Sequence, residues 1–267
     1  MSKAFCSNPR RGARLSVVIP VKNPDIQALE KTLTSVLSQS EVQVQLVVVG
    51  ALENKSASSL LLSTPDVRWV NEHDSGIYDA MNKGLSLSDG EYVLFLGAGD
   101  YLANASVGKQ VFDVARGFGY PHLIYGRVWD EDLGLVGGKF TRWALCRRNI
   151  PHQAIFYSRT VFEILGTYNE RYAILADYEF NMRCFAAGLK GVFLDMVVAV
   201  CAGGGISKRV RDVVFECEKE RLIWQYFGPL YGLSYTLGKR AKRYLRGLLG
   251  DWVNARKTGE VGPTSRP

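Results

Sequence analysis

Two segments of the sequence carry residue types that can bind a nucleoside diphosphate. The first is Glu72–Gly84, which includes Asp74 and Asp79, and the second is Gly97-Ala98-Gly99-Asp100. Each follows a short apolar run of the kind that forms a buried strand. In α/β folds, ligands gather at the carboxyl ends of the strands, so an acidic residue there can present its carboxylate to a metal-bound diphosphate. The two segments therefore favour nucleotide-sugar chemistry.

The elements that must position these residues are indicated by the apolar pattern of the N-terminal half. Asp25 can cap a helix in which Ile26, Leu29 and Leu33 recur at the spacing of one buried face. A Ser-rich helix is predicted near residues 58–62. Strands are predicted at residues 15–20, 44–49, 67–70 and 91–96, the last being the most apolar and therefore central. This order predicts a parallel sheet with right-handed crossovers.

The second half of the chain continues with strands and helices and then changes character. Residues 127–149 mix Gly, Trp and charged residues, and the apolar residues there recur with no clear period. This indicates loops and short antiparallel strands. Residues 230–252 combine Tyr, Leu and Trp with basic side chains, namely Lys239, Arg240, Lys242, Arg243 and Arg246. Helices are predicted at residues 107–118, 159–165, 178–187 and 213–227, and strands at residues 122–126, 154–157 and 192–200.

These elements predict four parts of the chain, which are a flexible segment 1–14, one α/β domain 15–210, C-terminal helices 211–256 and a disordered tail 257–267. The basic helices can lie in a membrane interface, or pack on the domain with a solvated basic side. No apolar run reaches the roughly 18 residues of a membrane-spanning helix. Residues 1–14 lack the apolar run of a signal peptide. We therefore expect a cytoplasmic protein, with peripheral contact to the inner face of the cell membrane left open.

Composition narrows the possible partners. The formal net charge of +7 is concentrated around residues 142–148 and from residue 208 onward, which favours a phosphorylated substrate or an acidic membrane surface. No zinc-finger, RNP-like or recognition-helix pattern is present, so nucleic acid is not expected. The 5 cysteines lack a CxxC pair or a His at ligand spacing, which argues against a zinc site or a disulfide framework. No GxGxxG follows the first strand, which argues against a Rossmann dehydrogenase.

Four motifs, in order along residues 15–207, resemble those of the inverting family 2 glycosyltransferases. They are Ser16–Asn23 (SVVIPVKN), Asp74–Gly84 (DSGIYDAMNKG), Gly97–Asp100 (GAGD), and His152–Phe156 (HQAIF) leading to Ala176–Glu179 (ADYE). The resemblance implies the GT-A nucleotide-diphospho-sugar transferase fold, an α/β fold whose mostly parallel central sheet is flanked by helices, here with a basic helical C-terminal tail. Within the family, the chain looks like the branch that makes bacterial surface polysaccharides and glycolipids.

The resemblance assigns the donor side to the first three motifs. Asp100 matches the acidic residue that holds the metal, and Mn²⁺ or Mg²⁺ can be bound through a single protein carboxylate. Asp74 would lie near the base or ribose, where Gly76 lets the backbone pass closely and Lys83 faces either phosphate or solvent. Nucleotide-sugar contacts are also implied for Gly99, Pro20, Val21, Lys22 and Asn23. The alternatives are turn or helix-cap roles for Asp74, Asp79 and Asp100.

The resemblance assigns the acceptor side to the last motif. Asp177 matches the family's general base, which takes the proton of the acceptor hydroxyl during inversion, and Glu179 is the fallback. His152 and Gln153 look like the His-Gln pair that lines the acceptor side, although a lone His is often structural. The glycine run at residues 203–205 and the basic residues Lys208, Arg209 and Arg211 lie in one segment. This segment can form either a mobile loop that closes over diphosphate or a solvated basic turn.

Two positions depart from the family pattern. Val49 stands where relatives often carry the carboxylate that recognises uracil, which leaves the choice between UDP and GDP open. Gly97 stands where many relatives have Asp or Asn, which leaves Asp100 to hold the metal. Both departures favour a protein with another donor or with reduced activity, whereas retention of Asp100 and Asp177 favours catalysis.

The sequence therefore predicts a metal-dependent inverting glycosyltransferase of hexosyltransferase type. It would move a sugar from a UDP- or GDP-linked donor to a lipid-linked saccharide or glycolipid acceptor in cell-surface glycan biosynthesis. The competing interpretation is a catalytically weak glycosyltransferase-like protein that binds a nucleotide or a partner enzyme as a scaffold.

Overall fold

The computed structural model describes residues 13–258. Most of the predicted N-terminal segment 1–14 and of the predicted tail 257–267 lies outside these residues. The chain forms two compact units, one up to Glu216 and one from Cys217 onward, and each is described by itself.

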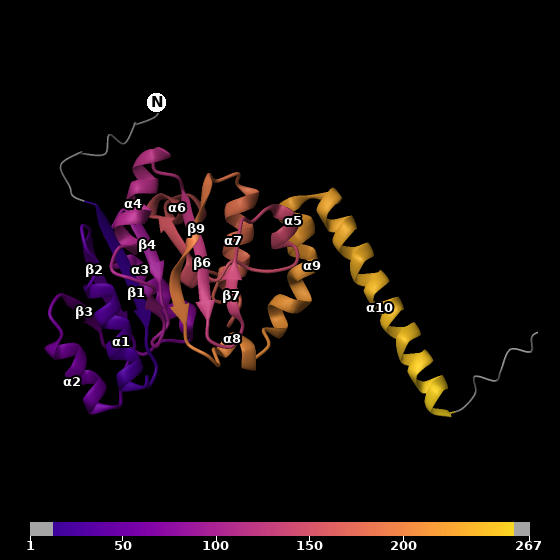
Figure 1. The fold of residues 1–267 in the computed structure, drawn as a ribbon, viewed down its shortest axis with the longest axis horizontal. Helices are drawn as coiled ribbons and strands as arrows, with labels where there is room; N and C mark the ends of the chain where they lie inside the picture. The colour runs from indigo at the N-terminus through magenta and orange to yellow at the C-terminus, as the bar shows by residue number, and fades with distance from the viewer. Residues whose placement is uncertain (1–12, 259–267) are drawn as a thin grey trace, which may run out of the picture. The chain divides into compact units, whose positions relative to one another are not determined.

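The first four long strands form a parallel sheet, as the order of elements predicts. Strand β1 pairs with β2 on one side and with β4 on the other, and β3 pairs with β2, all in parallel (Figure 1). The elements of this half are β1 (Arg14–Pro20), α1 (Ile26–Leu37), β2 (Gln43–Val49), α2 (Lys55–Ser63), β3 (Val67–Val70), α3 (Ile77–Ser86) and β4 (Tyr92–Phe95). The predicted strand positions are confirmed.

Local signals fix these elements. The Asp25 side chain accepts a 2.9 Å hydrogen bond from the Ala28 amide and so caps α1, whose buried face includes Leu29 and Leu33. Helix α3 lies very close to the sheet at Gly84, because a Cβ atom there would be 2.3 Å from Cγ1 of Val18 in β1. Only glycine permits this approach, which presses the helix that follows the Asp74 segment onto β1.

Beyond β4 the sheet becomes mixed. Strand order is β3-β2-β1-β4-β8-β6-β9-β5, with β7 paired to β6. Strand β8 is antiparallel to both neighbours, whereas β9 is parallel to β6. The elements are β5 (Tyr101–Leu102), α4 (Val107–Gly117), β6 (Leu123–Asp130), β7 (Gly134–Gly137), α5 (Arg142–Leu145), the 3₁₀ turn η1 (His152–Ala154), β8 (Ile155–Ser158), α6 (Arg159–Leu165), α7 (Ala176–Ala186), β9 (Gly191–Cys201) and α8 (Ile206–Arg209).

The segment 127–149, which has no clear period, contains the β6–β7 hairpin and the short helix α5. The two strands pair antiparallel from Arg127 opposite Gly137 to Asp130 opposite Gly134. The prediction of short antiparallel strands is therefore confirmed, while the strand predicted at 122–126 continues to Asp130.

An aromatic cluster anchors α7 against the sheet. Phe162 of α6 and Phe180 of α7 stack with ring centroids 4.9 Å apart, and Phe180 also meets Tyr157 of β8 edge to face. Phe95 of β4 and Tyr168 complete the cluster, with centroids 5.2 Å apart. Such aromatic pairs add about 0.5–1.5 kcal/mol each beyond their burial. The cluster fixes the first turn of α7, which carries Asp177.

The second unit contains the end of α9 (Val213–Phe227) and the long helix α10 (Pro229–Thr258). Glu220 of α9 accepts a 2.6 Å hydrogen bond from the Thr236 hydroxyl and forms a 3.1 Å ion pair with Lys239. The unit is thus a helical hairpin that turns at Gly228, where φ is +83°. Within residues 13–258, no helix combines the length and the apolar character needed to cross a membrane.

Candidate active site

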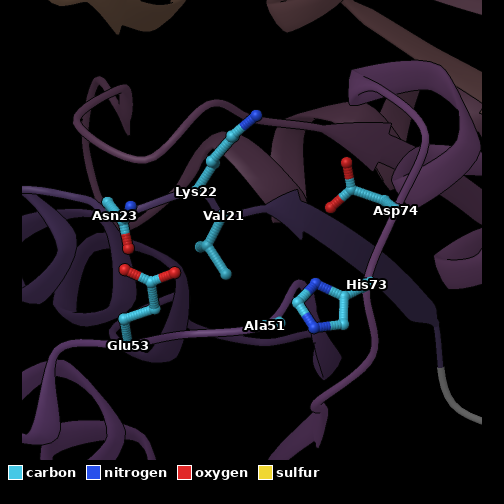
Figure 2. Close-up of a pocket in the computed structure, with 7 residues that line it drawn as sticks. All are labelled: Val21, Lys22, Asn23, Ala51, Glu53, His73 and Asp74. Atoms are coloured by element: carbon cyan, nitrogen blue, oxygen red, sulfur yellow. The ribbon is translucent and has the colours of Figure 1, made fainter.

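A pocket opens at the carboxyl ends of β1, β2 and β3. Its volume is about 120 Å³. Figure 2 shows the Asp74 carboxylate entering the pocket from one side and the Glu53 carboxylate from the other, with Lys22 and Val21 between them. The lining residues are Val21, Lys22, Asn23, Ala51, Glu53, His73 and Asp74. Four of them, Val21, Lys22, Asn23 and Asp74, were predicted from sequence to contact the donor.

The backbone of Gly50 lies against Val21, one of the residues that line this pocket. Gly50 has φ +146°, and a Cβ atom there would lie 2.0 Å from the carbonyl oxygen of Val21. The strand ends are tied by hydrogen bonds from the Val21 amide to the Val49 carbonyl, 2.8 Å, and from the Gly50 amide to the Val70 carbonyl, 3.1 Å. No residue with a side chain fits at position 50 without moving Val21.

Val49, the first departure from the family pattern, belongs to the buried core. Val49 is fully buried and pairs with Pro20 in the β1–β2 ladder, and it does not line the pocket. Glu53 lines the pocket instead, so a carboxylate reaches this site from four residues further along the chain. The signal for Glu53 was present in the sequence, as an acidic residue after a buried strand.

The loop between β3 and α3, residues 71–76, carries Asp74 and is called the Asp74 loop. Asp79 and Lys83 hold it in place. The Asp79 carboxylate accepts a 2.8 Å hydrogen bond from the Ser75 amide, and the Lys83 ammonium donates to the His73 carbonyl, 2.7 Å, and to Asp79, 3.1 Å. The Ser75 amide holds the pKa of Asp79 below its usual value, and Lys83 acts in the same direction. Of the alternatives for Asp79, this geometry favours the turn role. Lys83 does not line the pocket. A Cβ atom at Gly76 would have no atom within 4 Å, so no close neighbour requires glycine there.

Asp100 lies at the carboxyl end of β4 and is only 7% exposed. Its Oδ2 accepts hydrogen bonds from the Gly97 amide, 3.1 Å, and from Nε2 of Gln153, 2.8 Å. Its Oδ1 accepts from the Ala202 amide, 3.0 Å. The neighbouring Gly99, at φ +111°, donates its amide to Oγ1 of Thr32, 2.9 Å. The carboxylate is therefore fixed by three donors.

This arrangement is compatible with a divalent cation. Two carboxylate oxygens offer about four lone-pair positions, and three donors leave one for a cation. Within residues 13–258, no three His, Cys, Asp or Glu side chains gather into a centre made of protein ligands alone. Asp100 is therefore the carboxylate that would hold a divalent cation, because Mg²⁺ can be bound through one or two protein carboxylates.

Asp177 is 4% exposed and is surrounded by hydrogen-bond donors. Its Oδ1 lies 2.9 Å from the Tyr78 hydroxyl, and its Oδ2 lies 2.8 Å from Nδ2 of Asn149 and 3.4 Å from Nδ1 of His152. Burial raises the pKa of Tyr78 well above its usual value, and the charge of Asp177 acts in the same direction, so the hydroxyl stays protonated. Tyr78 lies in the donor-side motif and Asn149 in the segment without a period, and neither was predicted to contact Asp177.

Glu179 is occupied elsewhere. Its carboxylate forms a 3.0 Å ion pair with Nε of Arg183, one turn further along α7, and is 3% exposed. Residues two apart on a helix do not share a face, so Glu179 and Asp177 point in different directions. Of the two carboxylates, Asp177 is the one that lies beside His152.

The turn η1 joins the two sides of the site. His152 faces Asp177 and the next residue, Gln153, binds Asp100. The loop that contains the glycine run 203–205 begins beside Asp100, where the Ala202 amide donates a hydrogen bond to Oδ1 of Asp100. Further along this loop, Lys208 forms ion pairs of 2.6 Å with Asp130 and 2.7 Å with Asp132. Lys208 thus ties the loop to the β6–β7 turn in this structure.

The chain is similar in sequence to known glycosyltransferases. The sequence model of glycosyl transferase family 2 matches residues 16–118. A "PGL/p-HBAD biosynthesis glycosyltransferase" of Mycobacterium tuberculosis is 35% identical over 209 residues, covering 75% of this chain and 81% of that protein. An uncharacterized glycosyltransferase of the same species is 26% identical over 175 residues, covering 62% of this chain and 67% of that protein.

Solved structures share the fold at low sequence identity. S. aureus TarS superposes with a TM-score of 0.62 at 13% identity over 80% of this chain, which spans only 43% of the TarS chain. Its fragment 1–349 in complex with UDP gives a TM-score of 0.60 at 14% identity, over 80% of this chain and 70% of that one. The mannosyltransferase PcManGT of Pyrobaculum calidifontis, in complex with GDP-Man and Mn²⁺, gives 0.54 at 14% identity, over 86% of this chain and 66% of that one.

Proposed function

This chain belongs to glycosyl transferase family 2 and is a glycosyltransferase with the GT-A fold, and we propose that it transfers a sugar, with inversion, from a UDP- or GDP-linked donor to a glycolipid or lipid-linked saccharide acceptor. The observation that carries the proposal is the joining of Asp100 and Asp177 through the consecutive residues His152 and Gln153. One site thereby holds a carboxylate for the donor side and a carboxylate for the acceptor side.

The donor binds at the pocket between Lys22 and Asp74. Glu53 and Asp74 can accept hydrogen bonds from N–H and O–H groups of a base and a ribose, and Lys22 supplies a positive charge for phosphate. Structural neighbours of this chain are complexes with UDP, with UDP-GlcNAc and with GDP-Man, which supports a nucleoside-diphosphate sugar as the donor class.

Asp100 would hold a divalent cation, Mn²⁺ or Mg²⁺, on the donor side. When bound, the cation supplies Lewis-acid stabilisation of the charge that develops on the leaving diphosphate. Gly97 and Gln153 keep the Asp100 carboxylate oriented through the hydrogen bonds described above. The complex of PcManGT with Mn²⁺ supports this assignment.

The acceptor binds on the side of Asp177 and His152. Inversion requires that the acceptor hydroxyl lose its proton as its oxygen attacks the anomeric carbon, and Asp177 is the carboxylate that takes this proton. The "PGL/p-HBAD biosynthesis" name of the mycobacterial relative supports a glycolipid acceptor. Exposed leucines on α10, together with its basic residues, support contact of the C-terminal helices with the inner face of the cell membrane.

Calorimetry with UDP and GDP, each with and without Mn²⁺, tests the donor side first. We expect one nucleotide to bind, and to bind more tightly with Mn²⁺. The chain is then incubated with sugars linked to that nucleotide and with octyl glycosides as acceptor probes, and NMR reads the anomeric configuration of the product. A product with the donor's configuration contradicts inversion, and binding of neither nucleotide supports the scaffold interpretation.

A further inference from the structure

A chain of side-chain hydrogen bonds leads from the buried core to Asp177. Nδ2 of Asn149 donates a 2.8 Å hydrogen bond to Oδ2 of Asp177, and Oδ1 of Asn149 accepts one of 2.8 Å from Nδ2 of Asn181. The Tyr157 hydroxyl in turn donates to Oδ1 of Asn181, 2.8 Å. Asn149 lies between α5 and η1, whereas Asn181 lies in α7 and Tyr157 in β8. Three separate segments of the chain therefore meet at one carboxylate.

The direction of the hydrogen bonds in this chain is fixed at its buried end. Nδ2 of Asn181 also lies 3.3 Å from the carbonyl oxygen of Ile150, which can only accept. The Asn181 amide must therefore turn its NH₂ group toward Ile150 and Asn149. Burial raises the pKa of Tyr157 well above its usual value, so its hydroxyl stays protonated and can donate to the amide oxygen of Asn181. The oxygen of Asn149 then faces Asn181, and its NH₂ group faces Asp177.

The buried setting makes this arrangement hard to change. Asn181 is fully buried, and Asp177 is 4% exposed. Water cannot easily replace a lost partner there, and a buried polar group without a partner is costly. The amide of Asn149 is neutral, so it orients the Asp177 carboxylate and leaves its negative charge in place. Glu179 is held differently, because its carboxylate forms an ion pair with Arg183.

We propose that Asn149 and Asn181 are positioning residues for sugar transfer, and that both act through Asp177. The inference rests on the proposed function. Asn181 fixes the amide of Asn149, and Asn149 fixes the orientation of the Asp177 carboxylate toward the acceptor hydroxyl. A carboxylate that is already oriented needs no rearrangement when the acceptor binds. Proton transfer to a positioned side chain contributes about 10²-fold to 10⁴-fold to a reaction rate, and this contribution depends on the position.

The kinetics of Asn149→Ala test the proposal first. The assay uses the nucleotide sugar and the octyl glycoside with which the wild-type chain transfers fastest. We expect kcat to fall about 10-fold to 100-fold, the effect of losing a hydrogen bond to a charged group, while the KM for the donor and the binding of nucleotide stay unchanged. Asn104→Ala is the matched control and should keep the wild-type kcat, because the Asn104 side chain accepts from the amide and the hydroxyl of Ser106, ahead of α4.

Double variants separate action through Asp177 from a general structural role. Asn181→Leu keeps the side-chain volume and should lower kcat about fivefold, as for the loss of a neutral hydrogen bond, but should lower it no further in the Asn149→Ala chain. In the same way, Asn149→Ala should cost nothing more in an Asp177→Asn chain, whose transfer is followed with radiolabelled donor. Independent structural roles would instead give losses that add within each pair.

The outcomes that overturn the proposal are also distinct. They are a wild-type kcat in Asn149→Ala, a loss in Asn149→Ala that resides in nucleotide binding, and losses in the Asn149 and Asn181 pair that add. Asn149→Ser and Asn181→Ser, which also remove the amide, replace a variant that does not fold. A wild-type chain that transfers no sugar contradicts the proposed function itself, and this differs from an active wild type with a fully active Asn149→Ala.

Discussion

The backbone of Gly97 packs directly against the carboxylate of Asp100. The Gly97 amide donates a 3.1 Å hydrogen bond to Oδ2 of Asp100, and a Cβ atom at position 97 would lie 2.8 Å from the same oxygen. The second departure from the family pattern therefore has a steric reason in this chain. A Cβ atom at position 97 would press on the Asp100 carboxylate, so glycine at this position lets the carboxylate keep the orientation that the Gly97 amide gives it.

The first prediction concerns this pair. Gly97→Ala should displace the Asp100 carboxylate and weaken Mn²⁺-dependent nucleotide binding by about tenfold or more, the effect of losing a hydrogen bond to a charged group. Calorimetry with and without Mn²⁺ measures it. Gly117→Ala is the control, because a Cβ at the end of α4 meets nothing within 4 Å. Unchanged Mn²⁺ dependence in Gly97→Ala would show that Asp100 does not hold the cation.

The second prediction concerns Glu53 in the donor pocket. If its carboxylate accepts hydrogen bonds from the base, Glu53→Ala should weaken binding of the preferred nucleoside diphosphate by about tenfold, and binding of pyrophosphate should not change. Glu72→Ala is the control, since Glu72 is exposed nearby but does not line the pocket. Equal losses for the nucleotide and for pyrophosphate would place Glu53 outside the base site.

The third prediction concerns the pH dependence of stability. The pKa of Asp79 is lowered in the folded chain, chiefly by the Ser75 amide. A carboxyl group with a lowered folded-state pKa stabilises the fold above its unfolded pKa, which is about 3.9, and this contribution is lost as the pH falls through the folded value. Asp79→Asn should therefore cost about 1 kcal/mol at neutral pH, as for loss of a helix cap, and progressively less at acid pH.

Urea denaturation at neutral and acid pH measures this difference in the free energy of unfolding. Glu30→Gln, on the exposed face of α1, removes one negative charge without touching the Asp74 loop and serves as the control. A cost of Asp79→Asn that is the same at both pH values would contradict the role assigned to the Ser75 hydrogen bond.

The fourth prediction concerns the C-terminal helices. Leu230, Leu233 and Leu237 of α10 are exposed, and Lys242 and Arg243 follow on the same helix. Each basic residue near an anionic surface contributes about 1 kcal/mol to membrane binding. Reversing Lys242 and Arg243 together to Glu should therefore weaken binding to vesicles that contain phosphatidylglycerol by at least about tenfold.

Co-sedimentation with phosphatidylcholine vesicles, with and without phosphatidylglycerol, measures this effect. The matched control reverses Lys55 and Arg68 in the α/β unit, which changes the net charge equally. If both double variants lose binding to the same extent, the attraction belongs to the overall charge of the chain and not to α10.

The sequence by itself determined the first strands and the edge of the sheet where the pocket lies. The apolar runs gave β1 to β4 within about one residue of their bounds, and Asp25 caps α1 as predicted. Lys22 and Asp74 meet in one pocket because both follow parallel strands, whose carboxyl ends lie at the same edge. These features depend on local periodicity and on a topological rule, and both can be applied to a single sequence.

Only the tertiary structure decided how the carboxylates are held. Tyr78 reaches Asp177 across 99 positions of the chain, and Asn149 reaches it from a segment whose sequence shows no period. The directions of His152 and Gln153 depend on a single 3₁₀ turn, and the aromatic cluster around Phe180 fixes the helix that carries Asp177. Side-chain direction in such segments is set by long-range packing, which no local pattern in the sequence records.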